Sequence, residues 1–168
     1  MDIALTDRLL LRTVTLDDAA FYVELVNDPL FIAYIGQRHI TTLAAARAAL
    51  LEGPVAMLAE RGHALYMVTL ADGGAPIGMC GLIKRSSLPD VDLGYAFVPQ
   101  CRGHGYAIEA ARAMLTHARG LGLARLIAIT DPRNLASIGL LEKLGMRFVE
   151  TTKFSPVDPG TNVYAIDL

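Results

Sequence analysis

The chain has 168 residues, 53% of them hydrophobic, and a formal net charge of −2 at pH 7. This length suits one domain, over residues 1–168, with a substantial core. The weak negative charge and the lack of a basic run argue against a surface that binds nucleic acid. Apolar runs end before a membrane-spanning length and the first residues lack a signal-peptide pattern, so we expect a cytoplasmic protein without a membrane partner.

The first third of the chain predicts one strand and two helices. A leucine-rich run at residues 9–14 indicates a strand, and a threonine followed by two aspartates begins a helix over residues 15–27. Residues 30–40 have no clear period. An alanine-rich helix is expected over residues 41–52, and the Gly-Pro pair at residues 53–54 is expected to end it.

The middle of the chain predicts consecutive antiparallel strands. Runs at residues 64–70 and 76–85 flank an Asp-Gly-Gly turn at residues 72–74, which is typical of a β-hairpin. A third strand is expected over residues 91–98. A helix with an apolar alanine and methionine stripe follows over residues 104–119.

The last third predicts a strand over residues 123–130, a helix over residues 135–144 that ends at a glycine, and two strands over residues 147–153 and 161–168. This order of elements, without repeats or linkers, indicates a mixed α+β fold. An edge strand at residues 161–168 would suit a homodimer.

The most informative segment is Gln-Cys-Arg-Gly-His-Gly-Tyr-Ala at residues 100–107, here called the glycine loop, which joins an apolar strand to a helix. Unpaired N–H groups in a first helical turn point outward at the positive end of the helix dipole. Glycine lets an anion approach the backbone closely. The segment therefore predicts a phosphate-binding turn.

Other interpretations of the glycine loop are weaker. A dinucleotide-binding fingerprint requires a third glycine where this chain has Ile108, and it would lie on the first strand-helix-strand unit. A Walker loop requires a Gly-Lys-Ser/Thr sequence that the segment lacks. A glycine turn without any ligand remains the simplest alternative.

The glycine loop, Gly94-Tyr95 and the Asn-x-x-Ser-Ile-x-Leu-Leu-Glu-Lys-Leu-Gly-Met segment at residues 134–146 together resemble the GNAT superfamily of acetyl-CoA-dependent N-acetyltransferases. Residues 8–12 and 27–29 further resemble its branch of bacterial ribosomal-protein N-terminal alanine acetyltransferases. The resemblance implies a central, mostly antiparallel twisted sheet of about seven strands. This sheet would be splayed between the fourth and fifth strands and flanked by about four helices.

The resemblance also implies where acetyl-CoA would bind. The pantetheine arm would pair with the exposed backbone of Phe97 and Val98, and Asn134 and Ser137 would lie near the sulfur. For Asn134, capping of the following helix is an alternative or additional role. Amides of the glycine loop would bind the CoA pyrophosphate, namely those of Arg102, Gly103, His104, Gly105, Tyr106 and Ala107.

Acetyl transfer to an amine requires a base and a proton donor for the departing thiolate. Asp92 is the candidate base, because an aspartate in an apolar strand is disfavoured unless it is paired or functional; a salt-bridged structural role is the alternative. Glu109 is expected to face solvent. Relatives place a tyrosine as the acid where this chain has Leu141, so Ser137 becomes the candidate donor.

We therefore expect an enzyme that acetylates a primary amine, either a protein N-terminus or a small molecule, in a ternary complex. A catalytically silent acyl-CoA-binding protein is the alternative. Phe31, Tyr34 and His39 are candidates for the acceptor-site wall or for core packing. The scattered histidines and the two cysteines, Cys80 and Cys101, predict neither a metal site nor a disulfide framework.

Overall fold

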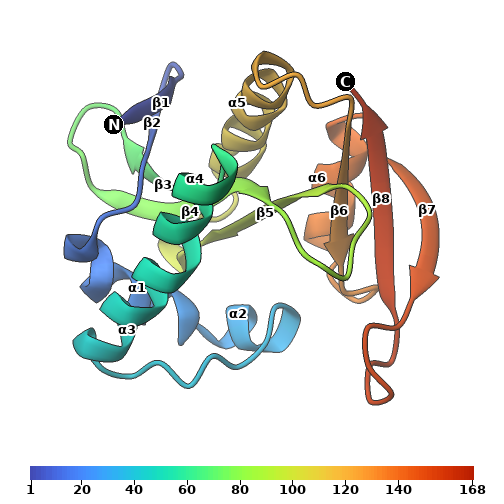
Figure 1. Cartoon of the computed structure of the whole chain (residues 1–168), viewed down its shortest axis with the longest axis horizontal. Coiled ribbons are helices and arrows are strands. Elements are labelled where there is room, and N and C mark those ends of the chain that lie inside the picture. The colour runs from blue at the N-terminus through green and yellow to red at the C-terminus, as the bar shows by residue number, and fades with distance from the viewer.

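The computed structural model describes all residues from 1 to 168 and contains one eight-stranded sheet in the order β1-β2-β3-β4-β5-β6-β8-β7 (Figure 1). All neighbouring strands are antiparallel except β5 and β6, which are parallel. The predicted mixed α+β, mostly antiparallel fold is confirmed. The strands are β1 (Asp2–Leu5), β2 (Leu9–Arg12), β3 (Leu65–Leu70), β4 (Pro76–Ile83), β5 (Val91–Phe97), β6 (Arg125–Thr130), β7 (Arg147–Thr152) and β8 (Thr161–Asp167).

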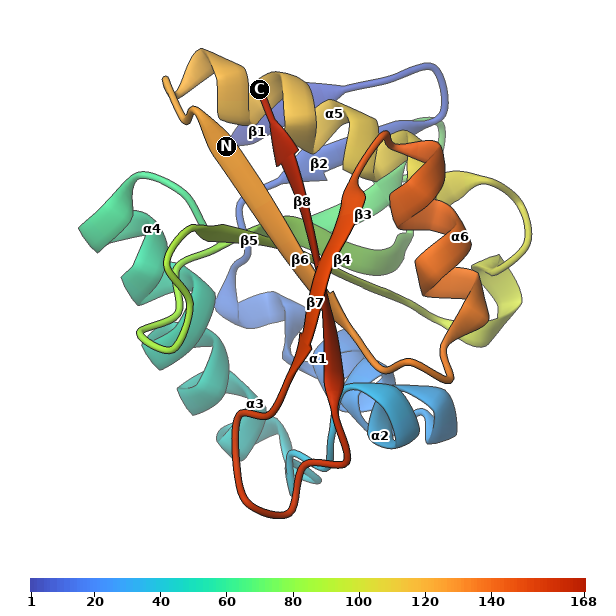
Figure 2. The same ribbon diagram turned by 90° about the vertical axis from the view of Figure 1, so that its right-hand side faces the viewer.

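Helices cover both faces of the sheet, with α5 on one side and α1, α2 and α3 on the other (Figure 2). No helix is both long and apolar enough to cross a bilayer. The α-helices are α1 (Ala19–Val26), α2 (Pro29–Tyr34), α3 (Leu43–Leu50), α4 (Ala56–Arg61), α5 (Tyr106–Gly120) and α6 (Leu135–Lys143), and the short η-helices are η1 (Leu16–Asp18), η2 (Leu51–Val55) and η3 (Pro99–Cys101).

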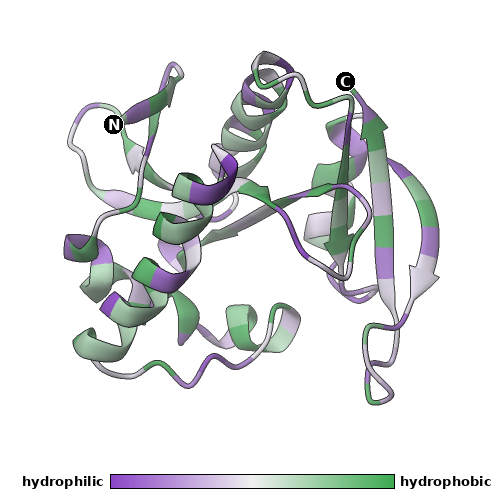
Figure 3. Cartoon of the chain, viewed as in Figure 1, coloured by the Kyte–Doolittle hydropathy of each residue, from purple (hydrophilic) through white to green (hydrophobic).

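Two main hydrophobic cores, one on each face, explain why the central strands are apolar along most of their length. On β3, Tyr66 and Val68 face the core beneath α5 and α6, whereas Met67 faces the core beneath α1 and α3. Alternate side chains of a strand point to opposite faces, so a strand covered on both sides has no polar face. The strands β7 and β8, in contrast, carry both hydrophobic and hydrophilic residues (Figure 3).

The structure contains two elements that the sequence did not predict, and one edge of the sheet differs from the prediction. The four-residue strand β1 precedes the first predicted strand, and α2 occupies part of the segment that was expected to be irregular. Asp28 caps α2 by accepting a hydrogen bond from the Phe31 amide at 3.0 Å. The prediction of an edge strand at residues 161–168 is wrong, because β8 pairs with both β6 and β7 and leaves β7 at the edge.

The Gly-Pro pair at residues 53–54 does not end the second predicted helix. Instead η2, a π-helix that contains Pro54, joins α3 to α4, and the chain stays helical to Arg61. In an α-helix, proline would lose one hydrogen bond and clash with the carbonyl four residues earlier. The wider π turn avoids this clash, and the Ala56 amide donates to the carbonyl of Leu51, five residues back.

The sheet opens between β5 and β6. These strands pair only at Val91 with Leu126 and at Asp92 with Ile127, close to the start of both strands. Beyond that point β5 stays on β4 while β6 stays on β8. The predicted splay is confirmed between the expected segments, which are the fifth and sixth strands because β1 is present.

Candidate active site

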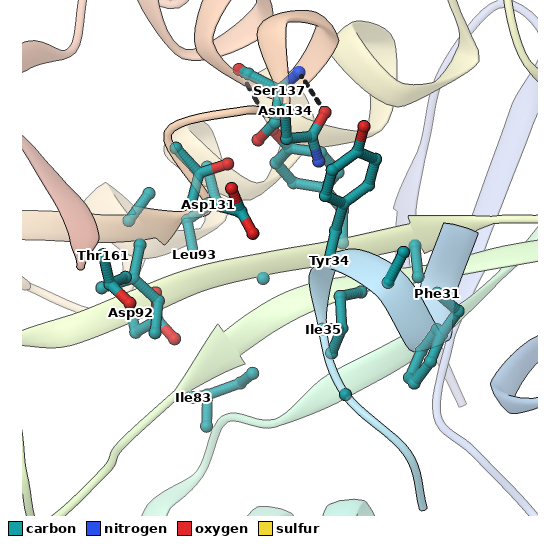
Figure 4. A pocket seen from close by; sticks show the side chains of 18 of the residues that line it. Phe31, Tyr34, Ile35, Ile83, Asp92, Leu93, Asp131, Asn134, Ser137 and Thr161 are labelled. Atoms are coloured by element: carbon teal, nitrogen blue, oxygen red, sulfur yellow. Dashed lines mark hydrogen bonds between the residues drawn. The ribbon is translucent and has the colours of Figure 1, made fainter. Parts of the chain in front are cut away.

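A cavity of about 630 Å³ lies at the opening between β5 and β6. Asp92 and Leu93 of β5 form one wall, and Asn134 and Ser137 of α6 lie across the opening from them (Figure 4). Tyr34 on α2 closes another side. Segments far apart in the sequence thus converge on one space, as expected of a ligand site.

The glycine loop carries a row of free backbone donors. None of the N–H groups of residues 103–108 donates a hydrogen bond within the protein, and the first turn of α5 begins at Tyr106. Gly103 and Gly105 adopt φ angles of 76° and 80°, a region that favours glycine. Gly103, His104 and Gly105 are exposed, so these amides are open to an anion.

Arg102 differs from the other predicted residues of the glycine loop. Its amide donates to the Pro99 carbonyl at 3.2 Å, so it is not a free donor. Its guanidinium forms an ion pair with Asp28 at 2.5 Å. The side chain of Arg102 therefore ties the glycine loop to α2, the helix that forms part of the cavity wall.

Asp28 is almost fully buried. Burial raises its pKa, but hydrogen bonds from Arg102 and the Phe31 amide more than offset this and hold the pKa below its ordinary value. The pair therefore stabilises the fold above the pKa that Asp28 has in the unfolded chain. This stabilisation is lost as the pH falls through the lower folded pKa.

We expect Asp28→Asn, which keeps a capping oxygen but removes the charge, to be less stable than the wild type at pH 7 and equally stable once Asp28 is protonated. Asp28→Ala should lose about 1 kcal/mol more at both pH values, because the cap is lost as well. Urea unfolding at neutral and strongly acidic pH measures both effects. Asp72→Asn, at an exposed turn, is the control for charge, and equal stability of Asp28→Asn and wild type at pH 7 would contradict the assignment.

Of the two residues predicted to pair with the pantetheine arm through their backbone, Phe97 and Val98, only Phe97 has an N–H group available. The Val98 amide already donates to the Ile77 carbonyl at 3.0 Å, across the β4–β5 ladder. Because such bonds alternate along an antiparallel strand, the backbone groups of Phe97 and Tyr95 point the other way, toward the splay. The N–H groups of Phe97 and Tyr95, rather than that of Val98, therefore point away from β4, and of these two residues Tyr95 lines the cavity.

Asp92 lines the cavity and is 1% exposed. Its Oδ2 accepts a hydrogen bond from Arg85 Nε at 2.8 Å, whereas its Oδ1 has no hydrogen-bond partner. Burial raises the pKa of Asp92, and the neighbouring Arg85 and the Ile129 backbone offset this only in part. One oxygen thus has the salt-bridged role and the other is free to accept a proton.

Asn134 and Ser137 lie at the start of α6, where Asn134 Oδ1 caps the helix by accepting from the Ser137 amide at 3.1 Å. The capping role of Asn134 is confirmed. The Ser137 hydroxyl lies 2.8 Å from the Tyr95 hydroxyl on β5. Leu141, at the position where relatives carry a tyrosine, is buried in the core.

The remaining candidate residues differ in whether they line the cavity. Phe31 and Tyr34 line the cavity, but His39 does not. Glu109 is not simply solvated, because it accepts hydrogen bonds from Thr6 and from Arg8 on the first hairpin. Glu109 therefore links α5 to the segment between β1 and β2.

The sequence did not predict two of the side chains that line the cavity. Arg85 was not singled out, and the Tyr95 hydroxyl was quoted only as part of a motif. Arg85 forms a hydrogen bond with Asp92, and Tyr95 forms one with Ser137. The Gly94-Tyr95 pair in an apolar strand is the only signal that the sequence offered for either of them.

Comparison with known proteins agrees with this geometry. The profile of the acetyltransferase (GNAT) domain matches residues 8–147. Over 83 residues the chain is 34% identical to the uncharacterised N-acetyltransferase YnaD of Bacillus subtilis, and the aligned part is 49% of each protein. The chain therefore matches about half the length of that relative.

Solved structures share the fold. An acetyltransferase from Agrobacterium tumefaciens is 27% identical with a TM-score of 0.81, over 97% of this chain and 92% of that one. The ribosomal-protein acetyltransferase RimL in complex with coenzyme A has a TM-score of 0.75 over 100% of this chain and 98% of that one. At 16% identity this second likeness shows the fold alone. Since the matched domain extends from β2 through α6 and includes both walls of the splay, the chain belongs to the GNAT acetyltransferase family.

Proposed function

We propose that this protein moves an acetyl group from acetyl-CoA to a primary amine, a protein N-terminus or a small molecule, by direct attack in a ternary complex. One observation carries the proposal. The strand that carries the unpartnered oxygen of Asp92 separates from β6 after that residue, and it leads into the free amides of residues 103–108. The amides suit a phosphate and the oxygen suits an amine proton.

The residues present fit this donor substrate. Free amides from Gly103 to Ala107 would bind the pyrophosphate, as positive-φ glycines leave room for it. The backbone of Phe97 and Tyr95 would pair with the amides of the pantetheine arm. When bound, acetyl-CoA supplies the activated acyl group as a thioester, so the protein needs no nucleophile of its own.

The roles of the side chains follow from their positions. Asp92 accepts the proton of the attacking amine, directly or through a water, with Arg85 holding its other oxygen. An N–H of β5 stabilises the oxyanion that forms on the carbonyl. Ser137 donates to the departing thiolate, directly or through water, and the positive end of α6 favours the same negative charge.

The acceptor would enter beside the aromatic side chains of α2. Phe31 and Tyr34 line this side of the cavity, and the segment from Phe154 to Thr161, between β7 and β8, contributes to the opposite side. These residues come from α2 and from the segment between β7 and β8, which are far apart in the sequence. The acceptor wall is therefore set by elements outside the glycine loop.

A silent acyl-CoA-binding protein is the second candidate, because buried Leu141 provides no phenol to the thiolate. The two candidates differ in one measurement. Free thiol released from acetyl-CoA is followed across a panel of N-terminal peptides, amino acids, polyamines and other small amines, beside calorimetric titration with acetyl-CoA. We expect binding and release with at least one class of acceptor. Binding without release across the panel would favour the silent protein, and absence of binding would exclude both.

A further inference from the structure

Two hydroxyl groups bridge the opening in the sheet. Tyr95 on β5 and Ser137 on α6 are 42 positions apart in the sequence, yet their oxygens lie 2.8 Å from each other. Both residues line the cavity and both are partly buried. A second, longer contact of 3.5 Å joins the Tyr95 hydroxyl to the Ser137 carbonyl.

The proton arrangement of this pair determines what the serine can do. Each hydroxyl has one proton to donate, so only one of the two oxygens is the donor in their shared bond. If Ser137 donated to Tyr95, the phenol proton would have only the Ser137 carbonyl as its acceptor. This carbonyl lies 3.5 Å from the phenol oxygen, which is too long for a strong hydrogen bond. If Tyr95 donates to Ser137, the serine proton is free to point into the cavity.

We propose that Tyr95 is a positioning residue, whose phenol donates to Ser137 Oγ and thereby directs the serine proton toward the departing sulfur. The inference rests on the proposed acetyl transfer. As the C–S bond breaks, its electron pair goes to sulfur and the Ser137 proton forms a hydrogen bond to it. The amine proton goes to Asp92 and then to water, and the thiolate takes its final proton from water. Tyr95 keeps its own proton throughout.

Two further observations support this role. Burial raises the pKa of Tyr95 to about 12, so the phenol stays protonated and remains a donor over the working pH range. Leu141 on α6 lies in the core, so no phenol reaches the sulfur from the helix. The phenol of this chain comes from β5 and acts through the serine.

The ionisation of bound CoA provides a test that needs no acceptor. The thiol pKa of CoA is titrated on the protein by the ultraviolet absorbance of the thiolate, with the unliganded variant subtracted. We expect the wild type to lower this pKa below that of free CoA. Tyr95→Phe should raise it by about one unit, a tenfold loss in the ionisation constant. Ser137→Ala should raise it at least as much.

The double variant decides between positioning and direct action. If Tyr95 acts only through Ser137, then Tyr95→Phe has no further effect in the Ser137→Ala background. Additive shifts, or an unchanged pKa in Tyr95→Phe, would overturn the proposal. Tyr164→Phe removes a hydroxyl from a buried tyrosine on β8 that does not line the cavity, and it should leave the thiol pKa unchanged.

Turnover separates this inference from the proposed function. With an accepted amine, Tyr95→Phe should lower kcat about tenfold and leave the KM for acetyl-CoA unchanged. A wild type that lowers the thiol pKa of bound CoA but acetylates no amine would refute the proposed function and leave the hydroxyl pair in place. A wild type that binds CoA without lowering its thiol pKa would refute the hydroxyl pair, whatever the turnover.

Discussion

Replacing Gly105 by valine is expected to reduce the affinity for CoA at least 100-fold. The φ angle of 80° disfavours a β-branched residue, and its side chain would project from the row of free amides that is to hold the pyrophosphate. Losing two hydrogen bonds to a charged phosphate costs about 3 kcal/mol, which is roughly 100-fold in Kd. Isothermal calorimetry with CoA measures the loss directly, and Gly103→Val should behave in the same way.

The backbone cost must be separated from the loss of the anion site. Gly122, just after α5, has a φ angle of 75° and no atom near the position of an added Cβ. Gly122→Val therefore carries a similar strain, about 1–2 kcal/mol, far from the amide row. We expect its unfolding midpoint to fall like that of Gly105→Val while its Kd for CoA stays at the wild-type value. Equal CoA binding by Gly105→Val and wild type would contradict the assignment of the phosphate site to the glycine loop.

The second large effect is expected from Asp92→Asn, which should lower kcat by about 10²- to 10³-fold, the usual contribution of a general base. In the wild type, activity should fall as the pH drops through the pKa of Asp92, which burial raises above its ordinary value. This acid limb should disappear in Asp92→Asn. Rate profiles over pH with a saturating donor measure both effects.

The acceptor amine also titrates, and it must be neutral to attack. Two acceptors with different amine pKa values distinguish the titrating groups. The acid limb of the rate profile that keeps the same pH midpoint with both acceptors belongs to the enzyme. If the stationary limb persists in Asp92→Asn, another group is the base.

Stability provides the control for this variant. Because the folded pKa of Asp92 is raised, the native state holds the proton more tightly than the unfolded chain, and stability falls as the pH rises through the folded pKa. At neutral pH the uncharged Asp92→Asn should therefore unfold at the same midpoint as the wild type or above it. A large drop in midpoint would mean that the loss of activity reflects misfolding.

Elements with a strong period were predictable, whereas short or distorted ones were not. Alternation and apolar stripes located β3 to β6, β8 and α5 because each of these packs residues against a core. The strand β1 has four residues at a sheet edge, too few for a period. The π-helix at Pro54 was not predicted, since proline normally ends a helix.

The candidate site shows the same division. A glycine pair between a strand and a helix is a local signal, and it led to the free amides of the glycine loop. The pairs Arg102 with Asp28 and Tyr95 with Ser137 join residues 74 and 42 positions apart. No spacing rule links residues at such distances, because their meeting depends on how β5, α2 and α6 pack in three dimensions.

The free amides of the glycine loop and of β5 bear on how far this sequence can diverge. Every residue except proline carries a main-chain N–H, so these backbone donors survive almost any exchange of side chain. Only the positive φ angles at Gly103 and Gly105 demand a particular residue. The ligand would thus be recognised by the backbone conformation, and side-chain substitutions elsewhere in these segments leave the hydrogen-bond donors in place.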